Sequence, residues 1–525
     1  MVNVPDNNQK MFKNPILPGF YPDPSICRVD TDYYLVTSSF AYFPGIPIFH
    51  SNDLVNWKQI GHVLDRVSQL NLDGLGHSDG IYAPTIRYHE GTFYLTTTNV
   101  YGGGNFIVTA PDPCGPWSDP IWLPEAPGID PSLFFDHDGR CYFLGTRPAP
   151  EGERYFGNYD IWLQELDLQS MTLIGEKYSL WRGALKDVCW PEGPHLYFKD
   201  GWYYLMIAEG GTDYFHAVTI ARSQKITGPY EGNRANPILT HRHLGREYPI
   251  VNVGHADLVE TQNGEWWMVV LGSRPYGGYY RNLGRETFLA PVVWEDGWPV
   301  VSPGTGRVEF NYVVPNLPES KKNEEPSRDD FNKEQLALYW NFLRTPRECF
   351  WSLTERPGWL RIKLKPEKLT DLANPAFIGR RQQHMNFTVN TLLEFVPASE
   401  GEVAGLVLLQ SNKYQYRYEF TTIDGKGRLR LIRCCDGIED ELAAKEVNCN
   451  QLIMRIVAKG QNYSFYYCVP NEAVATLIED VDGRILSTDV AGGFVGTYIG
   501  LFGTSNNRLT TNYVDFDWFE YTGED

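Results

Sequence analysis

The sequence has no long hydrophobic run and few positive charges for its size. No apolar stretch approaches the roughly 18 residues that a membrane-spanning helix needs. The first fifteen residues lack the apolar core of a secretory signal. Lys and Arg total 46 against 65 Asp and Glu, which gives a net charge of −19 and argues against nucleic acid or an anionic membrane as a partner. We therefore expect a cytoplasmic protein.

The nine cysteines also lack any recognisable pattern. No Cys-x-x-Cys pair occurs, and no Cys/His cluster has zinc-finger spacing, so free thiols are expected. Aromatic residues, by contrast, reach 14%, and the chain contains 49 Gly and 35 Pro. This composition is typical of short strands joined by tight turns. The aromatic excess also suits sugar binding, because the C–H faces of pyranose rings stack on aromatic planes.

One pattern occurs five times in the first 315 residues. Each copy has a short alternating strand, a polar turn and an aromatic strand, and the copies begin at Asp23, Ala83, Asp130, Glu192 and His255. Each copy predicts a β-hairpin, and further strand-like segments lie between the copies. Repeats of about 45–65 residues with four strands each predict propeller blades. The predicted fold is all-β, beginning with a five-bladed β-propeller.

The pattern changes after residue 315. Residues 316–330 are polar, charged and proline-bearing, which is typical of a linker. After the linker, about ten segments alternate apolar and polar residues and are separated by turns. These segments predict a C-terminal β-sandwich of the jelly-roll, concanavalin-like type. The predicted domains are thus the propeller over 1–315, the linker over 316–330 and the sandwich over 331–525.

Three of the five blade-start residues are carboxylates. The first strand of each propeller blade lines the central axis, so residues at blade starts meet at one mouth of the channel. Asp23, Asp130 and Glu192 hold nearly equivalent positions in three blades, and His255 begins the fifth. A single Asp before Pro is often only a turn former. Three converging carboxylates repel one another, and toleration of this repulsion indicates a functional site.

Paired carboxylates in an aromatic pocket predict glycoside hydrolysis. One carboxylate must deprotonate water, and another must stay protonated near neutral pH so that it can donate to the leaving oxygen. A third, ionised carboxylate beside the acid raises the pKa of that acid by like-charge repulsion. This reasoning leaves the three roles unassigned among Asp23, Asp130 and Glu192.

Long strings throughout the chain point to a known family. They include NPILPGFYPDPSI, GIDPSLFFDHDGR, PEGPHLY, GHADLVET and GRETFLAPVVW. With these strings the whole chain resembles glycoside hydrolase family 43, in particular its two-domain β-xylosidase and α-L-arabinofuranosidase members. The resemblance implies an inverting exo-hydrolase that needs no cofactor. Its expected substrates are xylo-oligosaccharides, from which it would remove non-reducing-end β-1,4-xylose, α-L-arabinofuranose or both.

The resemblance also assigns the catalytic roles. It implies that Asp23 is the general base, that Glu192 is the general acid, and that Asp130 tunes the pKa of the acid and holds its orientation. Inversion requires a water between the base and the anomeric carbon, so we expect the catalytic carboxyl groups to lie roughly 6.5–9.5 Å apart.

Five further positions match substrate-binding residues of the family. Arg285 would contact the sugar in the innermost subsite, and Phe40 and Tyr82 would be walls of that subsite. Related xylosidases often have Trp where this chain has Tyr82. His255 resembles an axial histidine that holds water or a cation, with a structural calcium ion as the candidate. Phe494 resembles a residue that the sandwich extends toward the pocket.

Two other classes compete with this reading. A non-catalytic sugar-binding propeller would have lost at least one carboxylate, whereas all three are present. An arabinan- or fructan-cleaving propeller hydrolase is the second competitor. Fructan-cleaving members resemble WMNDPNG at the first blade, where this chain reads FYPDPSI. The expected partner is a small oligosaccharide, and the sequence leaves room for a homo-oligomer.

Overall fold

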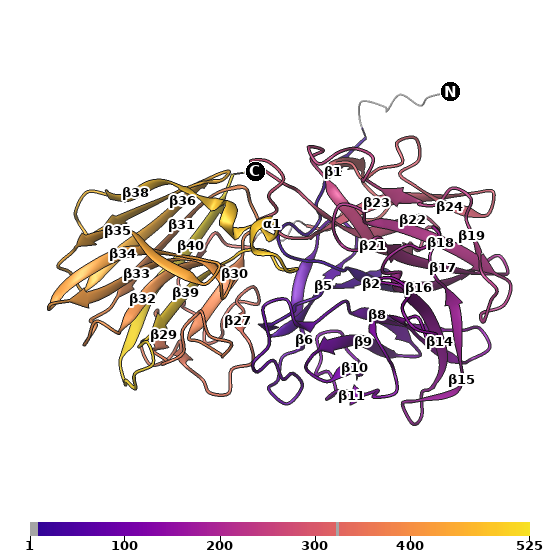
Figure 1. The fold of residues 1–525 in the computed structure, drawn as a ribbon, viewed down its shortest axis with the longest axis horizontal. Coiled ribbons are helices and arrows are strands. Elements are labelled where there is room, and N and C mark those ends of the chain that lie inside the picture. The colour runs from indigo at the N-terminus through magenta and orange to yellow at the C-terminus, as the bar shows by residue number, and fades with distance from the viewer. Residues whose placement is uncertain (1–8, 322–324, 525) are drawn as a thin grey trace.

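Two β-domains lie side by side in the computed structural model, which describes residues 9–321 and 325–524 (Figure 1). The predicted chain start and the predicted linker therefore fall partly outside the described residues. The only helical segments in these ranges are η1 (Gly483–Leu486) and α1 (Thr488–Ala491). Within the described part, no helix is long and apolar enough to cross a membrane.

Five separate antiparallel sheets confirm the predicted five-bladed propeller. They surround a common axis in the half of the molecule that is coloured indigo to magenta (Figure 1). In blade order, the strands are β2 (Ser25–Val29), β3 (Asp32–Val36), β5 (Gly45–Ser51) and β6 (Lys58–Leu64); β8 (Thr85–His89), β9 (Thr92–Val100), β10 (Gly104–Ala110) and β11 (Ile121–Trp122); β12 (Ile129–Phe135), β13 (Cys141–Pro148), β14 (Tyr159–Asp167) and β15 (Thr172–Trp181); β16 (Glu192–Lys199), β17 (Trp202–Glu209), β18 (Ala217–Ser223) and β19 (Glu231–Gly232); and β21 (Val251–Glu260), β22 (Trp266–Ser273), β23 (Glu286–Glu295) and β24 (Trp298–Val301). Two short strands extend these sheets: β7 (Gly80–Ile81) belongs to the second sheet, and β20 (Leu239–Thr240) belongs to the fourth.

The hairpin turns explain why the repeat could be recognised in the sequence. In the fourth blade, Asp200 and Gly201 both have positive φ, at 51° and 81°. Two such residues in a row form the turn whose twist matches that of the flanking strands. The segment at Asp136–Arg140 is likewise a hairpin turn, because the N–H of Asp136 donates to the carbonyl oxygen of Arg140 at 2.8 Å.

The ends of the propeller are tied together by backbone pairing. Strand β1 (Met11–Lys13) pairs with β25 (Asn311–Val313), which follows the fifth blade. The side chain of Asn14 donates to the carbonyl oxygens of Leu289 and Glu309, so the chain start is also fixed to that blade by a buried amide. The first and last blades are therefore held in one closed ring.

The second domain consists of two packed sheets, as the sequence predicts. The larger sheet has the order β28-β29-β40-β31-β36-β37-β38, with β26 beside β40, and the smaller has the order β30-β39-β32-β33-β34-β35. Their bounds are β26 (Arg328–Asp329), β28 (Trp351–Ser352), β29 (Leu360–Lys363), β30 (Phe377–Arg381), β31 (Asn386–Glu394), β32 (Val403–Ser411), β33 (Tyr414–Ile423), β34 (Lys426–Cys435), β35 (Ile438–Glu446), β36 (Gln451–Lys459), β37 (Asn462–Cys468), β38 (Ala475–Asp482), β39 (Tyr498–Thr504) and β40 (Tyr513–Gly523). Strand β26 lies inside the segment predicted as a linker and pairs with β40. The sequence did not predict this strand, because two residues are too few to show an alternating pattern.

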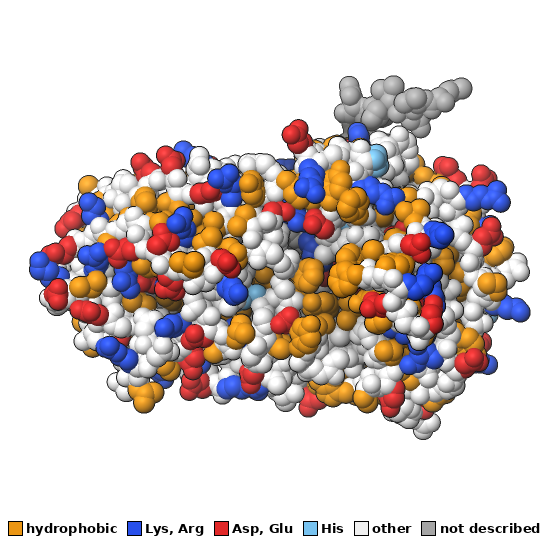
Figure 2. All heavy atoms as spheres, viewed as in Figure 1, with side chains coloured by type: hydrophobic (Ala, Val, Ile, Leu, Met, Phe, Trp, Pro, Cys, Tyr) orange, Lys and Arg blue, Asp and Glu red, His pale blue; other side chains and the backbone are white. Residues whose placement is uncertain are grey.

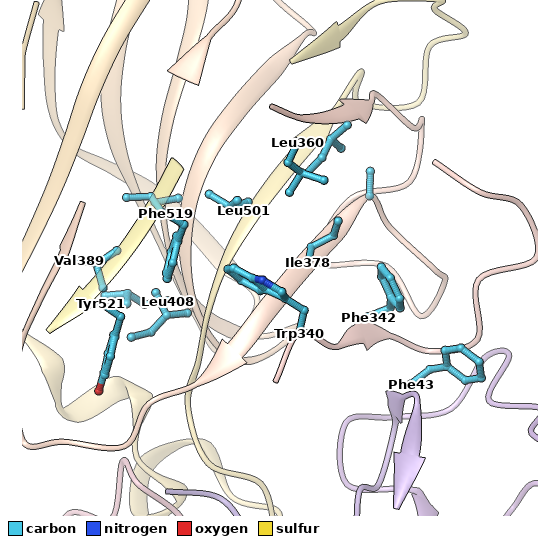
Figure 3. Close-up of a cluster of buried hydrophobic side chains, with 14 of the residues drawn as sticks. Phe43, Trp340, Phe342, Leu360, Ile378, Val389, Leu408, Leu501, Phe519 and Tyr521 are labelled. Carbon is cyan, nitrogen blue, oxygen red and sulfur yellow. The ribbon is translucent and has the colours of Figure 1, made fainter. Parts of the chain in front are cut away.

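The two domains share backbone pairing and a hydrophobic core. Strand β4 (Tyr42–Phe43) of the first blade pairs with β27 (Phe342–Leu343) of the second domain. Phe43 and Phe342 belong to one buried cluster that continues through Trp340 into the space between the two sandwich sheets (Figure 3). This contact places the sandwich against the first blade.

Candidate active site

A cavity of about 470 Å³ at the mouth of the propeller axis contains every site residue that the sequence predicts. The predicted residues in its lining are Asp23, Phe40, Tyr82, Asp130, Glu192, His255, Arg285 and Phe494. They come from all five blades and from the sandwich, and positions more than 450 residues apart in the chain (Phe40 and Phe494) meet there. The structure therefore brings the predicted set together, whereas the role of each residue remains a proposal.

The backbone turns the blade-start side chains into this cavity. Asp23, Asp130 and His255 all have left-handed backbone conformations, with φ of 53°, 53° and 48°. Non-glycine residues seldom adopt this region, and such strain concentrates at functional sites. In the fourth blade the left-handed residue is Gly193, with φ of 58°.

Glu192 therefore stands one residue earlier in its blade than the two aspartates do in theirs. In the fourth blade, regular pairing after the bulge resumes at His195, three residues after Glu192. In the third blade it resumes at Ser132, two residues after Asp130. The equivalence predicted from sequence is thus displaced by one position. A side chain at Gly193 would meet the ring of His255 at 2.8 Å, so a glycine there lets the histidine pack on the backbone.

An arginine, a histidine and a serine hydroxyl lie around Asp23. An Nη1 of Arg285 lies 2.6 Å from Oδ1, and the hydroxyl of Ser38 donates to Oδ2 at 2.6 Å. Nδ1 of His255 lies 4.0 Å from Oδ1. Burial acts to raise the pKa of Asp23, but Arg285, His255 and Ser38 outweigh burial and hold the pKa below its ordinary value. Asp23 is therefore ionised at neutral pH, as a base must be.

Glu192 is in the opposite state. Burial raises its pKa well above the ordinary value, and the nearby charges of Asp130 and Asp23 raise it further, while Arg285 opposes them. Burial also raises the pKa of Asp130, to about 6, with His255 and Arg285 opposing and Asp23 adding to the rise. Near neutral pH, Asp130 is ionised and Glu192 holds a proton that it can donate.

Aromatic rings form one wall of the cavity next to Arg285. The rings of Phe40 and Tyr82 are 5.1 Å apart between centroids, and Phe494 stacks on Phe40 at 6.1 Å. The guanidinium carbon of Arg285 lies 5.5 Å from the Phe40 centroid and 5.7 Å from that of Phe494. Phe494, which comes from the sandwich, therefore reaches the pocket and borders the same cation as Phe40.

The segment that carries Phe494 is anchored on two sides. On one side, the backbone N–H of Phe494 donates to the hydroxyl of Ser78 at 2.8 Å. On the other side, the Arg281 side chain makes a two-pronged ion pair with Asp489 of α1, with the Arg281 N–H also donating to Asp489. The neighbouring Asn282 accepts from the backbone N–H of Thr497 at 2.8 Å. These contacts fix a piece of the second domain across one side of the pocket.

Two family models match the chain. The model of glycosyl hydrolases family 43 matches residues 12–299, and that of the β-xylosidase C-terminal concanavalin A-like domain matches residues 328–522. The chain belongs to glycosyl hydrolase family 43. Family 43 glycosidases invert the anomeric centre and need no cofactor, so the protein is an inverting glycoside hydrolase, as predicted.

Relatives from this family align over nearly the whole chain. A xylosidase/arabinosidase of Butyrivibrio fibrisolvens is 50% identical over 511 residues, covering 96% of this chain and 98% of the relative. A non-reducing end α-L-arabinofuranosidase of Bacteroides ovatus is 43% identical over 521 residues, covering 98% and 95%. The crystal structure of xylan β-1,4-xylosidase from Bacillus halodurans superimposes with a TM-score of 0.92 at 40% identity, covering 97% of this chain and 100% of that one.

Outside the lining of the family 43 cavity lies a buried polar cluster that sequence reasoning missed. Below the carboxylates, Arg87 of the second blade pairs with Asp257 of the fifth at 2.8 Å and contacts Nδ1 of His195 at 2.9 Å. The hydroxyl of Ser25 donates to the same aspartate. Burial lowers the pKa of His195 to about 3, so this ring is neutral. The sequence contains a signal for this cluster, because Ser25, His195 and Asp257 are polar residues at the same strand position in three blades.

The surroundings of His255 do not resemble a calcium site. In the described residues, no group of three or more His, Cys, Asp and Glu side chains is placed to hold a metal ion. The nearby side chains include the imidazoles of His195 and His216, both of which burial makes neutral. Calcium takes six to eight oxygen ligands, which this set does not supply. The predicted structural calcium therefore has no support at this position.

Proposed function

We propose that this family 43 enzyme releases single xylose or arabinofuranose units from the non-reducing ends of short xylan-derived oligosaccharides. The observation that carries the proposal is the cavity itself. Its lining combines two ionised carboxylates and one protonated carboxyl group with an aromatic wall, to which the sandwich contributes Phe494. A pocket closed on one side by a second domain admits a chain end and blocks a continuous polymer. The names of the relatives from Butyrivibrio fibrisolvens and Bacteroides ovatus support these two sugars.

The proposed mechanism uses the opposite protonation states of two residues. Asp23 takes a proton from a water molecule, and the oxygen of that water attacks the anomeric carbon from the side opposite the leaving group. Glu192 gives its proton to the glycosidic oxygen as the bond to that oxygen breaks. Attack from the opposite face produces a hemiacetal of inverted configuration. Arg285 holds Asp23 ionised and borders the sugar, and Asp130 keeps the pKa of Glu192 high.

A side-by-side assay tests the substrate assignment. The enzyme should hydrolyse 4-nitrophenyl β-D-xylopyranoside, 4-nitrophenyl α-L-arabinofuranoside or both, and should release xylose from xylobiose. Proton NMR during turnover of xylobiose should show α-xylose first, as inversion requires. Linear arabinan and a fructan test the competing hydrolase classes. Inactivity on both nitrophenyl glycosides together with rapid cleavage of either polymer would overturn the proposal.

We further propose that the enzyme works in the cytoplasm on oligosaccharides that have already been imported. An exo-acting pocket suits such short substrates better than a polymer. Fractionation of cells that express the native gene tests this location, and activity found in the culture medium would contradict it. A homo-oligomer is also proposed, and light scattering of the purified protein measures its mass directly.

A further inference from the structure

A second group of aromatic side chains lies at the same cavity on the side of the third and fourth blades. Trp190 and Phe215 line the cavity, and Phe156 packs edge-on against Trp190 with ring centroids 5.2 Å apart. Phe156 is 80% exposed and Phe215 is 63% exposed. Figure 2 shows hydrophobic side chains gathered on the propeller half of the face in view. Single exposed apolar residues are common, but a cluster at the mouth of a pocket indicates a binding surface.

The backbone holds the ring of Trp190 in a fixed position. Trp190 has a left-handed φ of 48°, and its N–H donates to the carbonyl oxygen of Gly157 at 2.7 Å. A Cβ atom at Gly157 or at Gly211 would lie 2.8 Å from the indole, so two glycine backbones pack closely against it. Strain in a bulky residue, together with close packing of backbone, is expected where a ring must be presented to a ligand.

The position of Trp190 in the chain determines which part of the substrate it can meet. It precedes Glu192 by two residues, and Glu192 is the group that protonates the leaving oxygen in the proposed mechanism. The sugar beyond that oxygen therefore lies on the Glu192 side of the cavity. The wall built from Phe40, Tyr82 and Phe494 belongs to other blades and to the sandwich, and two of its rings, Phe40 and Phe494, border Arg285.

We propose that Trp190, flanked by Phe156 and Phe215, is the platform that binds the xylopyranosyl unit on the leaving-group side of the scissile bond. This inference rests on the proposed function. Equatorial substituents leave both faces of a β-linked xylopyranose flat and rich in C–H groups, and such a face stacks on an indole. The platform lies at the cavity mouth, so it binds the part of the oligosaccharide that leaves the enzyme.

Two substrates that differ only in the leaving group test the platform. Xylobiose places a sugar on the platform, whereas β-D-xylopyranosyl fluoride has a leaving group too small to reach it. Trp190→Ala should lower kcat/KM for xylobiose about three- to tenfold more than kcat/KM for the fluoride, which is the range expected for loss of one aromatic stacking contact. Trp190→Phe should restore part of the difference. Equal losses on both substrates would overturn the platform.

Exposed residues provide variants that are expected to fold. Phe156→Ala and Phe215→Ala remove side chains that are mostly in solvent, and each should lower the xylobiose-to-fluoride ratio about twofold or more. Phe198→Ala is the matched control, because Phe198 is a 43% exposed aromatic residue of the fourth blade that packs against His137 away from the cavity. Its ratio should equal that of the wild type, and a ratio lowered as much as in Phe156→Ala would contradict the proposal.

The wild-type enzyme separates the two levels of inference. A wild type that cleaves neither xylobiose nor the fluoride would overturn the platform, and the proposed function would fall with it only if both nitrophenyl glycosides also remain uncleaved. A wild type that cleaves both, combined with unchanged ratios in all three platform variants, would overturn the platform alone. A selective loss on xylobiose in those variants supports both.

Discussion

Asp23 in the first blade and Glu192 in the fourth lie in the same cavity and have opposite pKa shifts. Asp23 has an arginine at 2.6 Å and a serine hydroxyl at 2.6 Å, and these contacts outweigh its burial. Glu192 instead has two carboxylates among its neighbours, which add to the effect of burial. Burial alone therefore does not decide protonation in this site; the sign of the neighbouring charge does. The predictions below change one side of this comparison at a time.

Removal of the carboxylate in the first blade should have the largest effect. Asp23→Ala deletes the proposed base, so kcat should fall on the order of 10³-fold on xylobiose and on nitrophenyl glycosides alike. A good leaving group gives no rescue, because the attacking water still needs a base. Steady-state kinetics on both substrates measure this loss. Residual activity above one tenth of the wild type would remove Asp23 from the mechanism.

The corresponding change in the fourth blade should depend on the substrate. Glu192→Gln removes the proton donor, so kcat for xylobiose should fall about 10²-fold or more. The loss on 4-nitrophenyl β-D-xylopyranoside should be much smaller, since nitrophenolate leaves without protonation. Comparison of the two substrates for the same enzyme preparation gives the ratio. Similar losses on both would contradict the assignment of the acid.

Asp130→Asn should change the pKa of Glu192 in the fourth blade, because it removes a neighbouring negative charge. Without the negative charge of Asp130, the pKa of Glu192 should fall, so the basic limb of the kcat/KM profile should move to lower pH. A pH–rate profile on xylobiose measures the movement. An unchanged basic limb would deny Asp130 its tuning role.

The same variant should be more stable than the wild type at neutral pH. The pKa of Asp130 in the folded protein, about 6, is above that of an unfolded Asp, so its stabilising contribution is lost as pH rises through about 6. The gain in Tm from Asp130→Asn should therefore be larger at pH 7 than at pH 5. Calorimetry at the two pH values provides the measurement, and a larger gain at pH 5 would contradict the raised pKa.

The smallest predicted effect is on the pKa of Asp23 in the first blade. Ser38→Ala removes a hydroxyl that donates to ionised Asp23, so the pKa of Asp23 should rise and the acid limb should move to higher pH by about one unit or less. Ser39→Ala is the control, because the hydroxyl of Ser39 accepts from the N–H of Ile46 instead. The two variants should differ in the acid limb and agree in the basic limb.

The sequence predicted the blades well because each blade repeats a local pattern. Hairpin turns such as Asp200-Gly201 and recurring carboxylates at blade starts are local signals, and a propeller geometry converts them into one site. The eight predicted residues therefore meet in one cavity. The one-residue displacement of Glu192 could not be predicted, because it depends on where pairing resumes after a bulge.

Features that depend on contacts between distant segments remained hidden. The axial contacts of Arg87 with Asp257 and His195 join three blades, and no single stretch of sequence shows them. Strand β27 is two residues long and has its partner β4 about 300 positions earlier. Trp190 was missed because it lies in a loop, outside the repeated strand pattern.

The pairing of β4 with β27 has a consequence for how the molecule can be divided. Phe43 and Phe342 sit in one continuous apolar interior that crosses the domain border. Separation of the two domains would expose this interior on both fragments. It would also remove the aromatic ring of Phe494 from the pocket. A propeller fragment of this chain should therefore lose both solubility and the shape of its pocket, so the two domains work as a single unit.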